Sequence, residues 1–142
     1  MASIRKEILI EARPEQVWAA LRDVGAVHHR LMPGYVLDTQ LDGDTRILTF
    51  PSGGVVRELI VAIDDDARRL AYAVIEGRMP LVHHHASFQV FAEGASRSQL
   101  VWITDVLPHA LAAEIRPRVE RGADIMKQTL EEEAARANRT CS

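Results

Sequence analysis

Three consecutive histidines, His83, His84 and His85, are the densest group of side chains in this sequence that could do chemistry. Neighbouring side chains of a strand point to opposite faces, so His83 and His85 are predicted to share one face and His84 to lie on the other. Ala86 and Phe88 have the parity of His84, which indicates that His84 faces the interior. An imidazole with an ordinary pKa of about 6.5 exchanges hydrogen bonds or protons with a ligand at neutral pH.

A His-x-His pair on a strand can also bind zinc, because its two rings project side by side. Further ligands would have to come from His28, His29, Asp105 or a glutamate, and none of these has a clear place on a neighbouring strand. We therefore expect no metal and no other cofactor. Three roles stay open for His84: lining a cavity, binding a ligand, or transferring a proton.

Glu58 and Tyr72 are the other candidates for acid–base chemistry. Arg57 and Glu58 are adjacent on a predicted strand, so only one of them can face the interior. A carboxylate inside would anchor a ligand or act as an acid with a raised pKa, whereas the alternative is a surface carboxylate paired to an arginine. Tyr72 lies between Leu70 and Val74 on one face, where its ring either packs in the core or offers its hydroxyl to a ligand.

Asp105 shares its parity with two apolar residues, Val101 and Ile103. This pattern predicts that its carboxylate looks into the mouth of a cavity. The alternative is that Asp105 caps the turn ahead of Pro108.

Period-two alternation and turn residues between the runs predict seven strands and no parallel βαβ unit. The strands are expected at Ser3–Glu11, Tyr35–Leu41, Arg46–Phe50, Val55–Ile63, Leu70–Ile75, Leu81–Phe91 and Gln99–Leu107. Pro14, at a favourable first helical position, starts a short helix over Pro14–Asp23, and a second short helical turn follows at Ala26–Leu31. A stripe of apolar residues near the 3.6-residue period predicts one long helix over Pro108–Asn138.

This order of elements predicts an α+β fold in which a curved antiparallel sheet grips the long C-terminal helix. Such a grip often leaves a cavity between helix and sheet, and sparse polar groups among apolar ones are typical of a binding pocket. The predicted ligand-binding residues are Tyr72, Val74, Met79, Leu81, His84, Ala86, Phe88, Val101, Ile103, Asp105, Ile115, Val119 and Met126.

Composition limits the function further. The 142 residues are 47% hydrophobic and 26% charged with a net charge of −3, which fits one globular domain over 1–142 with a frayed tail at about 139–142. Without a basic patch we expect no nucleic-acid partner. Without an apolar run of about 20 residues we expect no membrane insertion. The single cysteine, Cys141, suits a reducing cytoplasm, and we expect a monomer or a homodimer.

Three segments carry a family resemblance: 12–18 (ARPEQVW), 58–70 (ELIVAIDDDARRL) and 101–108 (VWITDVLP). With the order of elements, they resemble the helix-grip fold of the START-related, Bet v 1-like (SRPBCC) superfamily, and within it the polyketide cyclase/dehydrase-like branch. The resemblance implies a hydrophobic cavity closed by two loops, which match 51–54 and 77–81 here.

The resemblance also implies a function. It favours binding or transport of a small hydrophobic ligand such as a lipid, a polyketide or an aromatic metabolite. The alternative is a cyclase or dehydratase that uses the same cavity, with His84, Glu58 or Tyr72 as its acid–base residue. A protein-interaction role is a third possibility, for which the sequence has no positive mark.

Overall fold

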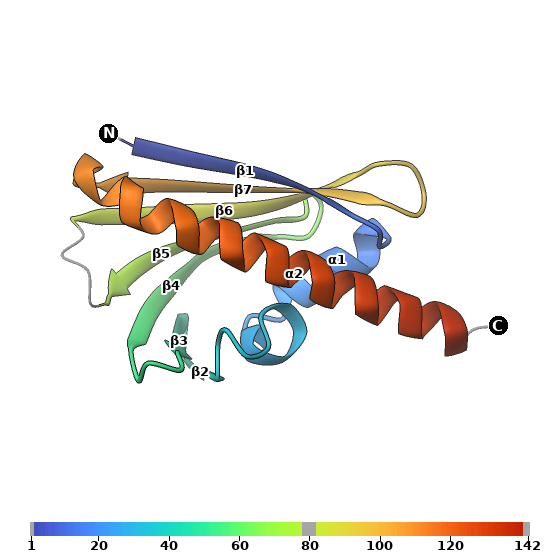
Figure 1. Ribbon diagram of the computed structural model, residues 1–142, viewed down its shortest axis with the longest axis horizontal. Helices are drawn as coiled ribbons and strands as arrows, with labels where there is room; N and C mark the ends of the chain where they lie inside the picture. The colour runs from blue at the N-terminus through green and yellow to red at the C-terminus, as the bar shows by residue number, and fades with distance from the viewer. Residues whose placement is uncertain (1, 78–81, 141–142) are drawn as a thin grey trace.

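A seven-stranded antiparallel sheet curves around one long helix in the computed structural model, which describes residues 2–77 and 82–140 (Figure 1). The strands are β1 (Ala2–Ile10), β2 (Asp38–Asp42), β3 (Thr45–Thr49), β4 (Val55–Asp64), β5 (Arg69–Glu76), β6 (His83–Ala92) and β7 (Ser98–Leu107). The helices are α1 (Pro14–Arg22), the π-helix η1 (Val27–Leu31), the 3-10 turn η2 (His109–Leu111) and α2 (Ala112–Thr140). The sheet order is β1-β7-β6-β5-β4-β3-β2, so the predicted α+β helix-grip fold is confirmed.

Two predicted boundaries are wrong by a few residues. The second strand begins at Asp38 rather than at Tyr35, because the amides of Tyr35 and Val36 bond back to the carbonyl of Met32 in a turn. The long helix begins at Ala112 rather than at Pro108, since the chain first makes the turn η2. Both differences arise from local hydrogen bonds that apolar periodicity does not encode.

The strand register defines which side chains share the concave side of the sheet, here called the inner face. Tyr72 lies opposite Ala86, which in turn lies opposite Thr104, and the next row pairs Phe88 with Trp102. All five are buried. The other inner-face residues that the argument uses are Ile4, Lys6, Ile8, Arg46, Glu58, Val74 and His84.

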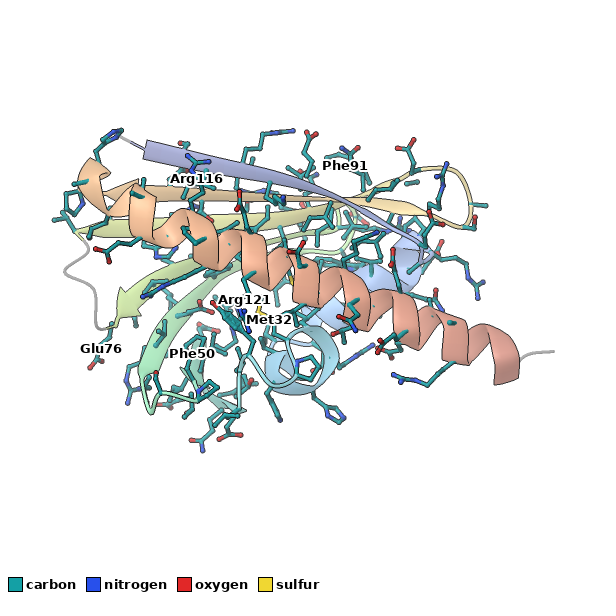
Figure 2. The ribbon with its side chains drawn as sticks, in the orientation of Figure 1. Met32, Phe50, Glu76, Phe91, Arg116 and Arg121 are labelled. Atoms are coloured by element: carbon teal, nitrogen blue, oxygen red, sulfur yellow. The ribbon has the colours of Figure 1, made fainter. Side chains whose placement is uncertain are left out.

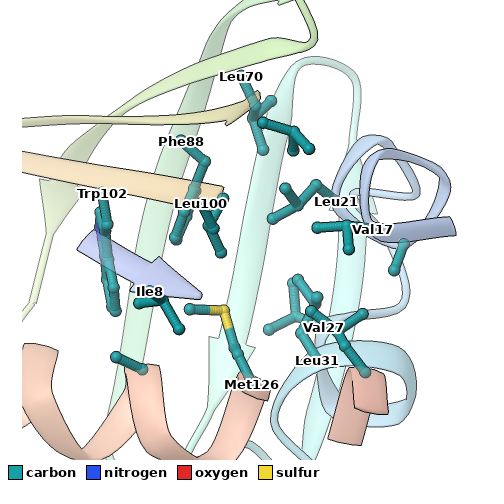
Figure 3. Close-up of a cluster of buried hydrophobic side chains, with 14 of the residues drawn as sticks. Ile8, Val17, Leu21, Val27, Leu31, Leu70, Phe88, Leu100, Trp102 and Met126 are labelled. Atoms are coloured by element: carbon teal, nitrogen blue, oxygen red, sulfur yellow. The ribbon is translucent and has the colours of Figure 1, made fainter. Parts of the chain in front are cut away.

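The helix α2 covers the inner face with an apolar stripe. Ile115, Val119, Met126 and Leu130 are spaced by four or seven residues, so they lie on one face of the helix, and they are buried. Each such side chain stabilises the fold by about 1.5–3 kcal/mol through burial. Figure 3 shows Met126 reaching toward Ile8 and the aromatic residues of the sheet.

Gly122, within this stripe, brings the helix close to the sheet. A Cβ atom at this position would lie 3.3 Å from the nearest ring atom of Trp102 and 3.5 Å from Cε of Met32. These distances leave little room for a side chain. A glycine therefore sets how closely α2 approaches the indole of Trp102.

A polar clamp fastens the second half of α2 to the end of β1. Nζ of Lys127 donates to the carbonyl of Leu9 and to Oε2 of Glu131, both at 2.6 Å, and the amide of Glu11 donates to the same Oε2 at 2.8 Å. Partial burial acts to raise the pKa of Glu131, but the hydrogen bonds from Lys127 and the Glu11 amide outweigh it, and the pKa is lowered.

Replacing Lys127 with methionine is expected to lower the free energy of unfolding by about 1 kcal/mol, because a partly exposed charge-assisted bond to a carbonyl is lost. Gln128→Met is the matched control, since Nε2 of Gln128 donates to Glu132 at 3.1 Å on the exposed side of the helix. Urea unfolding of both variants measures the difference. Equal stability of the two variants would contradict a role for the clamp.

Candidate functional site

A buried ion pair lies at one end of the inner face. Arg46 and Glu58 are directly opposite each other on β3 and β4, with exposed fractions of 3% and 6%. Nε and Nη2 of Arg46 both donate to Oε1 of Glu58, at 2.9 and 2.7 Å. Glu58 therefore faces inward, and it is paired to an arginine in the core rather than at the surface. Removing one partner of such a pair typically destabilises a protein by about 3–5 kcal/mol.

A row of aromatic rings continues from the ion pair across the sheet. The guanidinium carbon of Arg46 lies 5.3 Å from the ring centroid of Tyr72, a cation–π distance. Tyr72 stacks on Phe88 at 6.0 Å between centroids, and Phe88 lies 4.7 Å from Trp102. Burial and the nearby charge of Glu58 raise the pKa of Tyr72, so its hydroxyl keeps its proton at physiological pH.

Three polar atoms on β6 and β7 are buried without a hydrogen-bond partner in the part of the chain that the structure describes. They are Nδ1 of His84, Nε1 of Trp102 and Oγ1 of Thr104. Trp102 is 7% exposed and Thr104 is 1% exposed. The indole N–H lies toward the Tyr72 hydroxyl and acts to lower its pKa, but it is not in hydrogen-bond geometry. Each unmet group of this kind costs about 1–3 kcal/mol.

His84 has the orientation that alternation predicted. It is half-buried on the inner face, whereas the rings of His83 and His85 stack on the outer face at 6.4 Å between centroids. Burial, followed by the electrostatic influence of the neighbouring His83 and His85, lowers the pKa of His84 to about 4. His84 is therefore an uncharged hydrogen-bonding group at neutral pH.

The prediction that Val101, Ile103 and Asp105 face the cavity is wrong. Asp105 lies opposite His85 and Ser3 on the outer face, where the Ser3 hydroxyl donates to its carboxylate. The strand β7 carries apolar residues on both faces, so its parity alone could not distinguish them. The inner positions belong to Leu100, Trp102, Thr104 and Val106.

The remaining predicted residues divide into three groups. Ala86, Phe88, Ile115, Val119 and Met126 are buried in the core between sheet and helix, and Tyr72 joins them. Val74 lies half-buried opposite Glu58. Met79 and Leu81 lie outside the described residues.

Arg46 is a site residue that the sequence analysis missed. Arginine is mostly a surface residue, and no local pattern marks this one as buried. Only the pairing of β3 with β4 places it against Glu58.

Two hollows at the surface lie away from the inner face. One of about 420 Å³ follows the exposed side of α2 beside Lys127 and Glu131. The other, of about 240 Å³, lies between α1 and α2 beside Gln16 and Leu130. Neither is lined by a predicted ligand-binding residue, and those residues of the inner face pack against α2 instead.

Within the described ranges, no three histidine, cysteine or acidic side chains are placed to hold a metal ion. The same part of the chain contains no helix that is both long and apolar enough to cross a bilayer.

Comparison with known proteins places this chain in a family. Residues 1–134 match the family described as polyketide cyclase/dehydrase and lipid transport. No curated protein matches the sequence. The protein XoxI of Bacillus cereus is similar in structure, with a TM-score of 0.80 and 21% identity over 95% of this chain and 96% of that one.

Two further structures show the same fold. A START superfamily protein of Mycobacterium smegmatis has a TM-score of 0.74 and 12% identity over 95% of this chain and 98% of that one. The ZhuI aromatase/cyclase of Streptomyces sp. R1128 has a TM-score of 0.73 and 18% identity, over 99% and 98%.

The fold and the family match therefore define a helix-grip domain of the START-like type. The chain belongs to the polyketide cyclase/dehydrase and lipid transport family, as the sequence resemblance predicted. Family and fold together indicate a ligand-binding domain.

Two buried threonines test whether the Thr104 hydroxyl lacks a partner. Thr104→Val is expected to raise the free energy of unfolding by about 1 kcal/mol, because an unmet hydroxyl is replaced by a methyl group of the same shape. Thr39 is the control, since its Oγ1 contacts the His28 amide at 3.2 Å and the His28 ring at 3.0 Å. Thr39→Val should lower stability by about 1 kcal/mol. Chemical denaturation measures the stability of both variants. If Thr104→Val and Thr39→Val lose the same amount of stability, the Thr104 hydroxyl has a hydrogen-bond partner.

His84 is expected to make stability depend on pH. The unfolded chain protonates this imidazole near its ordinary pKa of about 6.5, whereas the folded protein does so only at about 4. The folded state therefore binds fewer protons in this window, and its stability falls as the pH falls.

The loss in free energy of unfolding caused by His84 should reach on the order of 2 kcal/mol as the pH falls from 6.5 to 5. His84→Gln removes it, so the stability difference between wild type and variant should be constant above pH 7 and shift in favour of the variant below 6.5. Denaturant unfolding across this range gives both curves. Parallel curves at all pH values would disprove the shift.

Proposed function

We propose that this protein binds and carries a small, mostly apolar molecule between the inner face of its sheet and α2. The observation that carries the proposal is a set of three polar atoms, on His84, Trp102 and Thr104, that lie among buried aromatic rings and have no partner within residues 2–77 and 82–140. Ligand pockets combine apolar walls with a few convergent polar groups. The family description, which includes lipid transport, supports the same reading.

A ligand would enter where α2 meets η1 and the β3–β4 turn. Met32 and Phe50 are half-buried there, and Tyr35 meets Phe50 edge-on at 6.0 Å. The guanidinium of Arg121 lies 5.8 Å from the Tyr35 ring, which closes this rim from the helix side. Figure 2 shows Met32, Phe50 and Arg121 on the side of α2 away from β1. Methionine changes shape readily, so this rim can adapt to a ligand.

Binding fits the described side chains better than the cyclase or dehydratase alternative. A general acid or base works best when its pKa is near the working pH. The pKa of His84 is about 4 and that of Tyr72 is raised, so both are poorly matched to neutral pH. Glu58 is held by Arg46. If the protein were an enzyme, the His84→Gln variant would lose turnover but still bind the ligand.

Three expectations from the sequence stay predictions: a cytoplasmic location, a monomeric or dimeric state, and the lack of a nucleic-acid partner.

Filling the inner face should block uptake of an apolar probe. Ala86 is 1% exposed between Tyr72 and Thr104, so Ala86→Leu is expected to weaken the binding of Nile red by about tenfold or more. Ala73→Leu, the same change on the outer face opposite His85, should leave binding unchanged. Fluorescence titration measures both affinities.

Extra volume in a packed core typically destabilises a protein by about 1–3 kcal/mol. Thermal melts must therefore show that the Ala86→Leu protein is folded at the temperature of the titration, and Ala86→Val serves as a milder variant. Unchanged uptake by folded variants would refute binding at the inner face. Native mass spectrometry of the purified wild type complements the test, since a bound molecule appears as extra mass that is lost on denaturation.

A further inference from the structure

We infer that the ligand is an uncharged molecule with a flat apolar body and a carbonyl-type oxygen that accepts a hydrogen bond from Nε1 of Trp102. The inference rests on the proposed function and deepens it by naming the class of ligand. It is carried by the balance of charges on the inner face, the kind of polar atom left unmet, and the aromatic rings beside it.

The charges of the deep inner face cancel. Arg46 and Glu58 neutralise each other through two hydrogen bonds to one carboxylate oxygen. His84 and Tyr72 are uncharged at neutral pH, because burial lowers the pKa of the first and raises that of the second. An anion or cation placed beside them would lose its hydration without gaining a counter-charge, which disfavours a charged ligand.

Two further cations lie at the margins of this region. Lys6 is opposite Trp102, but it is half-exposed on the edge strand β1, where its ammonium can reach water along the edge. Arg121 is exposed at the rim against the ring of Tyr35. Both are hydrated positions, so neither requires a negative charge on a buried ligand.

The unmet atom of Trp102 specifies an acceptor. An indole N–H can only donate, whereas the Thr104 hydroxyl and the neutral His84 ring can each donate or accept. A Cβ atom at Gly122 would lie 3.3 Å from the indole, so the ring has little room to turn, and the Tyr72 hydroxyl that its N–H faces is outside hydrogen-bond geometry. A ligand without an acceptor would leave this buried donor unmet and would bind more weakly for that reason.

The rings that surround Trp102 favour a flat body. The ring centroid of Phe88 lies 4.7 Å from that of Trp102 and 6.0 Å from that of Tyr72. An aromatic surface therefore already runs across the three strands β5, β6 and β7. Aromatic groups gain further stabilisation when they stack or meet edge-to-face. A planar ligand therefore fits better than a branched aliphatic one.

The inference is tested with three naphthalenes that differ only in the substituent on one ring carbon: acetylnaphthalene, naphthoate and ethylnaphthalene. They present the same flat body with an uncharged carbonyl, an anion or no acceptor. Their affinities are measured by displacement of Nile red from the full-length protein at pH 7.5. Acetylnaphthalene is expected to bind about tenfold more tightly than either of the others.

A pair of tryptophan variants assigns the effect. Trp102→Phe keeps a ring but removes the N–H, so acetylnaphthalene and ethylnaphthalene should then bind within about threefold of each other. Trp18→Phe is the matched control, because Nε1 of Trp18 donates to Asp65 at 2.9 Å, away from the inner face. That variant should keep the wild-type preference.

A spectroscopic readout avoids dependence on a variant that fails to fold. In wild type, the carbonyl stretch of bound acetylnaphthalene should lie at lower frequency than in cyclohexane, as a hydrogen-bonded carbonyl requires. An unshifted band overturns the assigned hydrogen bond.

The other outcomes separate the two proposals. If the protein takes up Nile red but binds naphthoate or ethylnaphthalene as tightly as acetylnaphthalene, the proposed ligand class is wrong. Binding at the inner face would still stand. A ketone preference that survives in Trp102→Phe overturns the role of Trp102. Failure of wild type to take up Nile red and all three naphthalenes overturns the proposed function together with this inference.

Discussion

The close seating of α2 on the inner face is the constraint on which the rest of the structure depends. Gly122 lets the helix backbone approach the Trp102 ring, and the stripe through Ile115, Val119 and Met126 then seals the concave side of the sheet. The inner-face side chains that pack against this stripe are consequently buried, and the indole of Trp102 is among them. The burial of the Trp102 indole, and with it the cost of leaving its N–H unpaired, follows from this contact.

An inner face selected for stability alone would be apolar. This one contains a buried ion pair, which hydrophobic residues of similar volume can often replace without loss. It also contains a tryptophan and a threonine whose polar atoms lack partners among the described residues. Violations of local rules of this kind concentrate at functional sites. Under the proposed function, a ligand that pairs with the polar atoms of Trp102 and Thr104 recovers the stability lost there.

The sequence predicted the fold well because the evidence for it is local. Alternation marked the strands, and the apolar period marked the long helix. His84 was oriented correctly because apolar residues on β6 share its parity, but β7 is apolar on both faces, so Asp105 was given the wrong side. Arg46 could not be found, because its burial depends on the cross-strand register that brings it to Glu58. Trp102 was recognised only as a packing residue, since its unmet N–H is a property of three-dimensional packing.

The same contacts that close the site also determine where it can open. The second half of α2 is held to β1 by Lys127 and Glu131, and its middle is held to the sheet at Gly122. Displacing either would expose a large part of the core. The rim formed by Met32, Tyr35 and Phe50 depends on fewer buried contacts, and local opening is favoured where buried contacts are sparse. A ligand that reaches Trp102 should therefore enter past this rim, while α2 keeps its position.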